Sequence, residues 1–146
     1  MLFAAAPTWA QESELPADLV EQMAALAREA LPMARLEDGS NVPPETEAER
    51  SRPIVPRALE AQTIERGILT GRMAYCGLDW QNLSYLPYMQ ALRRRYRGKP
   101  MAFVGLLHGI SQEWTTAAME QDHDVCTDEM RTRLTAEAAG RRIDVP

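Results

Sequence analysis

The chain offers few side chains suited to catalysis, because its 146 residues include two histidines and two cysteines. His108 lies in the most apolar stretch of the sequence, between Gly105 and Gly109, with Gln112 one helical turn further on. Glycines beside an imidazole can open a pocket in which the ring acts as a general base. No second catalytic group stands at helical spacing around it. We therefore favour a core histidine, bonded to a backbone carbonyl or to Gln112, and keep these four residues as a candidate pocket.

The second histidine belongs to the segment HDVC at positions 123–126. This segment resembles the His-Asp-x-Cys active-site core of phospholipases A2, and YCG at positions 75–77 resembles part of that family's calcium loop. The resemblance implies a histidine that activates water and an aspartate that helps to hold calcium. It covers seven residues of 146, and Met119 and Glu120 stand where the family has paired cysteines. We therefore assign no phospholipase activity.

The same region carries residue types that bind metals, namely Asp122, His123, Asp124 and Cys126. A closed zinc site needs four ligands of suitable type, including free thiolates where cysteine takes part. In an exported chain the two cysteines pair with each other. We therefore predict a disulfide between Cys76 and Cys126, no metal and no cofactor. The sequence also lacks the haem-attachment, redox, phosphate-loop and hydrolase-elbow motifs.

The N-terminal residues 1–10 are mainly apolar and end in small residues, Thr8 and Ala10, ahead of Gln11. This pattern is typical of the end of a secretory signal peptide, although no basic residue precedes the apolar run. We predict that residues 1–10 are a signal-peptide remnant, that processing follows Ala10, and that the protein is periplasmic or secreted. A short N-terminal helix of a cytoplasmic protein is the alternative. No stretch reaches the roughly 20 apolar residues of a membrane span.

Charge is distributed unevenly along the chain, although its net value is −5. Residues 11–50 are strongly acidic and residues 51–100 strongly basic, with a dense arginine run at 93–97. Such a run can bind nucleic acid or anionic lipid. The overall acidity and the predicted export argue against nucleic acid. The acidic residues 37–49 are an available intramolecular partner.

The elements that position these side chains are predicted to be helical throughout. Residues 11–36 form an N-terminal amphipathic helix, because apolar residues recur every three or four positions from about Pro16 to Leu31. Residues 37–53 are rich in proline and acidic residues without apolar periodicity. They predict an irregular linker that is more mobile than the rest. Residues 54–146 are predicted to be the helical core.

Four core helices are predicted from caps, prolines and glycines, at about 56–76, 80–97, 100–118 and 127–140. Pro87 should kink or interrupt the second of them after Tyr85 or Leu86. The third is apolar on nearly every side, so we expect it to form the centre of the bundle. Asp124 or Thr127 should cap the last one.

Two glycine pairs stand one helical turn apart, Gly67 with Gly71 and Gly105 with Gly109. Glycine inside a helix costs about 1 kcal/mol relative to alanine, so a paired occurrence suggests a structural reason. We predict that the two helices cross at close range where the four glycines meet. Replacement of Gly109 by leucine should then destabilise the fold.

The sequence therefore predicts an all-α, single-domain bundle of four to five helices stapled by one disulfide. This layout is similar to that of acid-stress periplasmic chaperones and of helical periplasmic immunity proteins. We expect non-enzymatic binding of another periplasmic protein or of an envelope component. An acid-stress chaperone and a small hydrolase using His108 or His123 remain alternatives, and the oligomeric state stays open.

Overall fold

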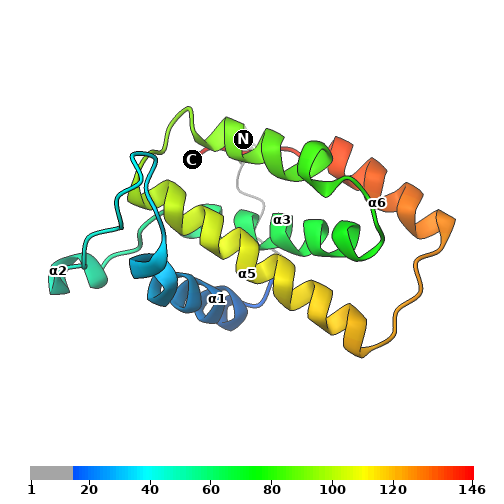
Figure 1. Cartoon of the computed structure of the whole chain (residues 1–146), viewed down its shortest axis with the longest axis horizontal. Helices are drawn as coiled ribbons and strands as arrows, with labels where there is room; N and C mark the ends of the chain where they lie inside the picture. The colour runs from blue at the N-terminus through cyan, green and yellow to red at the C-terminus, as the bar shows by residue number, and fades with distance from the viewer. Residues whose placement is uncertain (1–14) are drawn as a thin grey trace, which may run out of the picture.

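The computed structural model describes residues 15–146, so the predicted signal remnant lies outside the described residues. Within them the chain forms helices and no strand, apart from an isolated bridge between Arg35 and Asn41. This confirms the predicted all-α single domain. The elements are α1 (Ala17–Ala30), η1 (Leu31–Met33), α2 (Glu47–Arg50), α3 (Arg57–Tyr75), η2 (Gln81–Tyr85), α4 (Leu86–Leu92), α5 (Lys99–Gln121) and α6 (Asp128–Gly140) (Figure 1).

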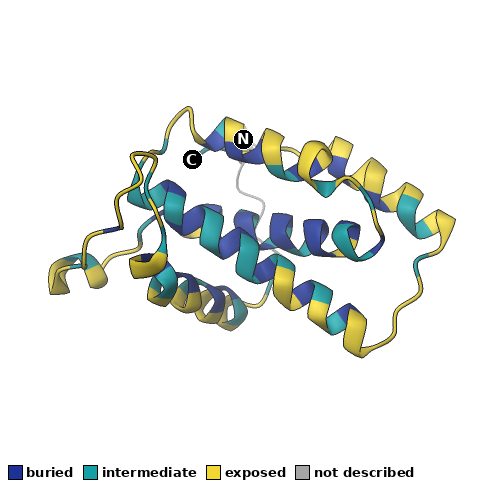
Figure 2. Cartoon of the chain, in the orientation of Figure 1, coloured by how far each residue is buried: buried dark blue, intermediate teal, exposed yellow. Residues whose placement is uncertain are grey.

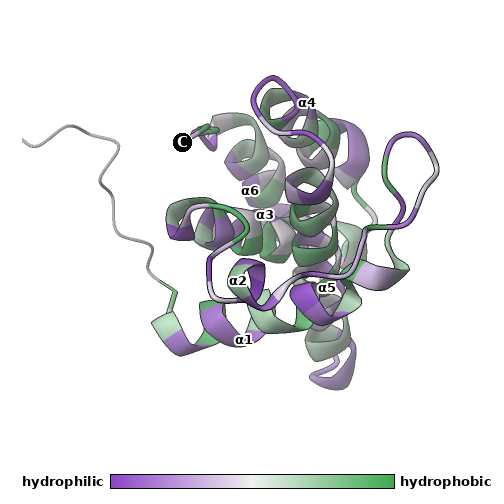
Figure 3. Ribbon diagram, turned by 90° about the vertical axis from the view of Figure 1, so that its left-hand side faces the viewer, coloured by the Kyte–Doolittle hydropathy of each residue, from purple (hydrophilic) through white to green (hydrophobic). Residues whose placement is uncertain are grey.

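Helix α3 is the centre of the bundle together with α5. Viewed along the bundle, α3 is enclosed by α1, α4, α5 and α6 (Figure 3). Most of α3 is buried, whereas α5 keeps an exposed outer face that includes Trp114 (Figure 2). The sequence predicted a central α5 but did not indicate that α3 would be the more deeply buried helix. Helix α3 is less apolar than α5, because its buried positions include Glu60, Thr63, Arg66 and Thr70. Its sequence therefore gave a weaker indication of burial.

The glycines of α3 allow the close crossing with α5. A Cβ atom added at Gly67 would lie 2.6 Å from Ser111 Cβ and 2.7 Å from the carbonyl oxygen of His108. A Cβ atom added at Gly71 would lie 2.7 Å from Thr115 Cβ. Real Cβ atoms do not approach neighbours this closely, so only glycine fits. The predicted close crossing is confirmed for this side of the contact.

The other glycine pair was placed wrongly by the sequence prediction. A Cβ atom added at Gly105 or Gly109 would meet nothing within 4 Å. The α5 residues at the crossing are instead Ser111 and Thr115. At 3.6 residues per turn, Gly109 and Ser111 are separated by about 200° around the helix, so they occupy opposite faces.

The predicted disulfide is present and ties the end of α3 to the loop before α6. The Sγ atoms of Cys76 and Cys126 are bonded, with their Cα atoms 5.5 Å apart. Helix α3 ends in a Schellman motif: Leu78 N–H donates to the carbonyl of Met73 at 2.9 Å, and Gly77 adopts φ 72°. Because α3 stops here, Cys76 is held at a defined point beside its partner.

The predicted helix at 80–97 is interrupted before Pro87, as expected. Its first part is the π-helical turn η2, in which Leu86 N–H donates to the carbonyl of Gln81. A π turn is a common way to accommodate a break in the regular hydrogen-bond ladder. Helix α4 ends at Leu92, so the arginine run 93–97 lies in a turn and the irregular residues after it and not in a helix. The predicted helix at 80–97 therefore extended too far toward the C-terminus.

The segment 37–53 is mostly irregular but is anchored to the body. It contains α2, which Thr46 caps by accepting the Glu49 N–H at 3.2 Å. Glu45 receives hydrogen bonds from Arg28 at 2.7 and 3.1 Å and lies 3.6 Å from Lys99. The hydrogen bond from Arg28 is the main cause that lowers the pKa of the Glu45 carboxyl. Residues 37–53 therefore make more contacts with the body of the protein than their composition indicates.

Candidate functional site

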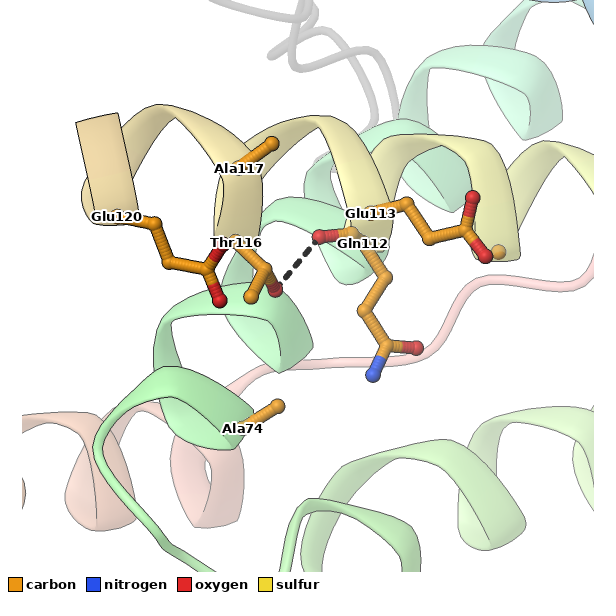
Figure 4. A pocket seen from close by; sticks show the side chains of 7 residues that line it. Ala74, Gln112, Glu113, Thr116, Ala117 and Glu120 are labelled. Carbon is orange, nitrogen blue, oxygen red and sulfur yellow. Dashed lines mark hydrogen bonds between the residues drawn. The ribbon is translucent and has the colours of Figure 1, made fainter.

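A groove follows one side of α5. Its first part, of about 530 Å³, lies between α5, the η2–α4 segment and the loop 34–37. It is lined mainly by Tyr85, Met89, Met101, Gly105, Leu106 and Ile110. Its second part, of about 400 Å³, is lined by Ala74, Gln112, Thr116, Ala117 and Glu120 (Figure 4). Both parts share Gly109 and Glu113, so we treat them as one feature, the α5 groove.

The two ends of the α5 groove differ in charge. Arg35 and Arg93 line the end near the start of α5, accompanied by Glu37. Glu113 and Glu120 line the end near the close of α5, where the described lining contains no cation. In Figure 4 both carboxylates project from α5 along the same side of the helix. A ligand that fills the groove lengthwise would therefore meet cations at one end and anions at the other.

His108 does not line this groove but lies packed beneath it. Its side chain is 1% exposed, and its ring centroid is 4.9 Å from that of Tyr85, which does line the groove. Its Nε2 lies 3.0 Å from Thr70 Oγ1, and the Thr70 hydroxyl donates to the carbonyl of Gly67. With the hydroxyl proton directed at Gly67, the neutral tautomer that fits is the one with its proton on Nε2, which then donates to Thr70. Burial, aided by the positive charge of Arg66, lowers the pKa of His108 to about 4.

The four predicted pocket residues are therefore separated by the fold. Gly105, Gly109 and Gln112 line the α5 groove, whereas His108 is a satisfied core histidine. The hydrogen-bond partner of His108 is Thr70 on α3, not Gln112 on its own helix. A partner on another helix cannot be found from spacing within one helix.

The HDVC segment ends helix α5. His123 is exposed and adopts φ 52°, the left-handed conformation that usually favours glycine. Its N–H donates to the carbonyl of Glu120 at 3.2 Å, and Asp124 N–H donates to that of Met119 at 3.0 Å. This is a Schellman motif like the one that ends α3. Within residues 15–146 no group of three or more acidic, histidine or cysteine side chains is placed to hold a metal ion.

A buried arginine was missed by the sequence prediction. Arg66 is 1% exposed, and its guanidinium lies 5.1 Å from the ring centroid of Tyr88. Its Nη1 is 3.5 Å from Ser84 Oγ, its Nη2 donates to the carbonyl of Arg141 at 3.3 Å, and its Nε has no partner among the described residues. Burial is the main cause that lowers the pKa of this guanidinium. Arg66 is therefore a desolvated cation with weak, neutral partners.

A polar stripe in α3 was the available signal for this cluster. Thr63, Arg66 and Thr70 stand three and four residues apart, so they share one helix face. Thr63 lies 2.7 Å from the hydroxyl of Tyr88, and burial raises the pKa of that phenol to about 12. The apolar residues beside this stripe were sufficient to predict a helix, but they did not indicate that the polar face would also be buried.

Comparisons of the chain with protein-family models, with curated proteins and with solved structures yield no match. Among the described helices, none combines the length and the apolar character that crossing a membrane requires. Function is therefore argued from the geometry of the groove and of the buried polar cluster.

Proposed function

We propose that this protein binds a helix of a partner protein in the α5 groove and performs no catalysis there. The observation that carries the proposal is the open glycine pair, Gly105 and Gly109, on the groove side of α5. The same spacing at Gly67 and Gly71 receives a helix of this chain at close range. The outer pair offers a similar bare backbone to a helix from outside. The apolar side chains around it supply the contact surface of a helix-in-groove complex.

The charges of the groove favour one orientation of that partner helix. Its acidic end would lie near Arg35 and Arg93, and its basic end near Glu113 and Glu120. Complementary charge of this kind contributes to specificity and to the rate of association. We therefore expect an amphipathic helix with small residues at its centre and opposite charges at its two ends.

Export is part of the proposal. The Cys76–Cys126 disulfide supports an oxidising compartment, since intracellular thiols usually stay reduced. The apolar sequence before Gln11 adds a second line of support. Mass analysis of the native protein should find a chain that begins at or near Gln11. An intact residue 1–10 segment in a cytosolic fraction would contradict export.

The binding proposal can be tested with a photo-crosslinking amino acid at position 113 in cells that carry the gene naturally. Glu113 is exposed and lines both parts of the groove. The same group at Glu129, an exposed position of α6, is the control. Mass spectrometry of the product identifies the partner segment, which is then synthesised as a peptide.

The peptide should become helical on binding, as measured by circular dichroism. A Cβ atom at position 109 would meet nothing within 4 Å, so the Gly109→Leu side chain should project into the groove. It should weaken binding at least tenfold while leaving the melting temperature near that of the parent. Equal crosslinking from positions 113 and 129 would overturn the proposal. So would a peptide that binds Gly109→Leu as tightly as the parent.

An acid-stress chaperone is the second candidate, and the observation that favours it is His108. A buried, neutral imidazole must take up a proton when the fold opens at low pH, which promotes exposure of apolar surface. Suppression of client aggregation at pH 4 but not at pH 7 would support this role. The hydrolase alternative receives no support, because His108 is packed and His123 belongs to a helix terminus.

A further inference from the structure

The C-terminal residues 141–146, here called the strap, run back from α6 along α3. The amide group of Gln62 binds both backbone groups of Asp144: Nε2 donates to its carbonyl at 2.8 Å, and its N–H donates to Oε1 at 2.8 Å. Ile143 and Val145 pack against the main hydrophobic core. Hydrogen bonds to both the N–H and the carbonyl of one residue, with alternating apolar contacts, are how proteins hold an extended peptide. The strap therefore occupies its site as a peptide ligand would.

The strap also covers the buried guanidinium of Arg66. The Arg141 carbonyl at 3.3 Å is the strap's contact with it, and Ser84 Oγ at 3.5 Å is a distant partner. Within the described residues Arg66 forms no ion pair with a carboxylate, and its Nε is unpartnered. The Glu137 carboxylate favours the charged form of Arg66 only from beyond ion-pair distance. A buried cation without a directly bonded anion is unfavourable, and a carboxylate is its best geometric match because it accepts two parallel N–H bonds.

We propose that the strap is a displaceable cover over a carboxylate-binding site headed by Arg66. The ligand is an extended peptide segment that takes the place of the strap on Gln62 and presents a carboxylate to the Nε and Nη atoms of Arg66. The site is separate from the α5 groove, since it lies among α3, η2 and the end of α6.

The charges around the strap refine the ligand. The Arg141 side chain lies 3.6 Å from Glu65 and is bonded to Glu137. When the strap leaves, this cation leaves with it, and Glu137 loses its ion pair with Arg141. A ligand with a basic residue beside its acidic one would restore that pairing. The site therefore takes a short acidic–basic sequence in preference to an acidic tract.

The test uses the full chain with a loosened strap. Asp144→Pro removes the N–H that Gln62 accepts, and Tyr96→Phe removes the hydroxyl that donates to the carbonyl of Pro146. The matched control is Asp144→Ala with Tyr96→Phe, which keeps the backbone N–H. The readout is the NMR resonance of the Arg66 Nε–H during titration with the peptides acetyl-Glu-Arg-Ile-amide and acetyl-Gln-Arg-Ile-amide.

In the loosened chain the glutamate peptide should shift this resonance saturably and bind at least tenfold more tightly than the glutamine peptide. The control chain should bind both more weakly. Titration with sodium acetate, with sodium chloride at equal ionic strength as its control, distinguishes a peptide from a free carboxylate. If acetate saturated the shift at a concentration similar to that of the glutamate peptide, the ligand would be a free carboxylate and the peptide part of the proposal would be wrong.

An Arg66 Nε–H resonance whose chemical shift stays unchanged with both peptides and with acetate would overturn the proposal. Equal binding of the two peptides would also overturn it. Arg66→Gln in the loosened chain supplies an independent readout by calorimetry, in which the preference for the glutamate peptide should disappear. The measurement on Arg66 itself does not depend on whether that variant folds.

Discussion

His108 couples the stability of this protein to pH. Its pKa is lowered to about 4 by burial, whereas the unfolded chain has a value of about 6.5. Between these values the unfolded state holds a proton that the folded state lacks. The free energy of unfolding should therefore fall as pH drops from about 6.5 to 4, by about 3 kcal/mol for this group. Urea unfolding at a series of pH values measures it.

The matched variant for this prediction is His108→Gln, which keeps a hydrogen-bonding side chain near Thr70 without a titrating ring. Its stability should vary less with pH over the same window. Parallel pH profiles for parent and variant would show that other groups control acid sensitivity.

The two glycine pairs predict opposite effects of one substitution. Gly67→Ala places a Cβ atom against Ser111 and the α5 backbone, so it should destabilise by about 1–3 kcal/mol. Gly105→Ala meets nothing within 4 Å and improves helix propensity, so it should stabilise by up to about 1 kcal/mol. Chemical denaturation of both variants measures the difference. If the Gly67→Ala protein were as stable as the parent, α3 and α5 would not cross closely.

At the scale of elements, two helices end in the same motif with different residues. Gly77 takes the left-handed position after α3, and His123 takes it after α5. A side chain in this conformation is strained by about 1–2 kcal/mol. His123→Gly should therefore stabilise by about 1 kcal/mol, after the added flexibility of glycine in the unfolded chain is subtracted. Thermal unfolding tests it, with Gly77→Ala as the reverse change, which should destabilise.

The segment 37–53 is predicted to be more mobile than the rest of the chain. Its amides should exchange with solvent faster than those of residues 100–112, because it is mostly irregular and exposed. Arg28 holds it through Glu45 and through the carbonyls of Glu49 and Arg52. Arg28→Met should therefore accelerate exchange within 37–53 and leave α3 unchanged. Exchange as slow as that of residues 100–112 in the parent would contradict the prediction.

For the molecule as a whole, the disulfide supplements a core that is already substantial. Cys76 and Cys126 are 50 positions apart, and closing such a loop stabilises by about 4 kcal/mol in the chain-entropy model. Reduction should lower the melting temperature without abolishing the helical circular dichroism signal. Thiol titration of the unreduced protein should find no free thiol. Loss of the signal on reduction at 25 °C would show that the core alone does not fold.

Local chemistry in the sequence determined the helical elements and the disulfide. Several helix ends are marked by residues that act on the backbone within one turn, namely prolines 56, 87 and 100 with Gly77, Asp79 and Thr127. Two cysteines in a chain of this kind leave one possible pairing. The helix ends depend on neighbours along the chain and the disulfide on the number of cysteines, so both can be predicted without the fold.

The tertiary structure alone decided which faces meet. Both glycine pairs have the same spacing, yet one pair lies under Ser111 and Thr115 and the other forms the open wall of a groove. The burial of Arg66 and the packing of His108 against Thr70 likewise depend on which helices surround α3. Periodicity assigns residues to a face of a helix, but the packing free energy of the whole bundle selects the partner of that face.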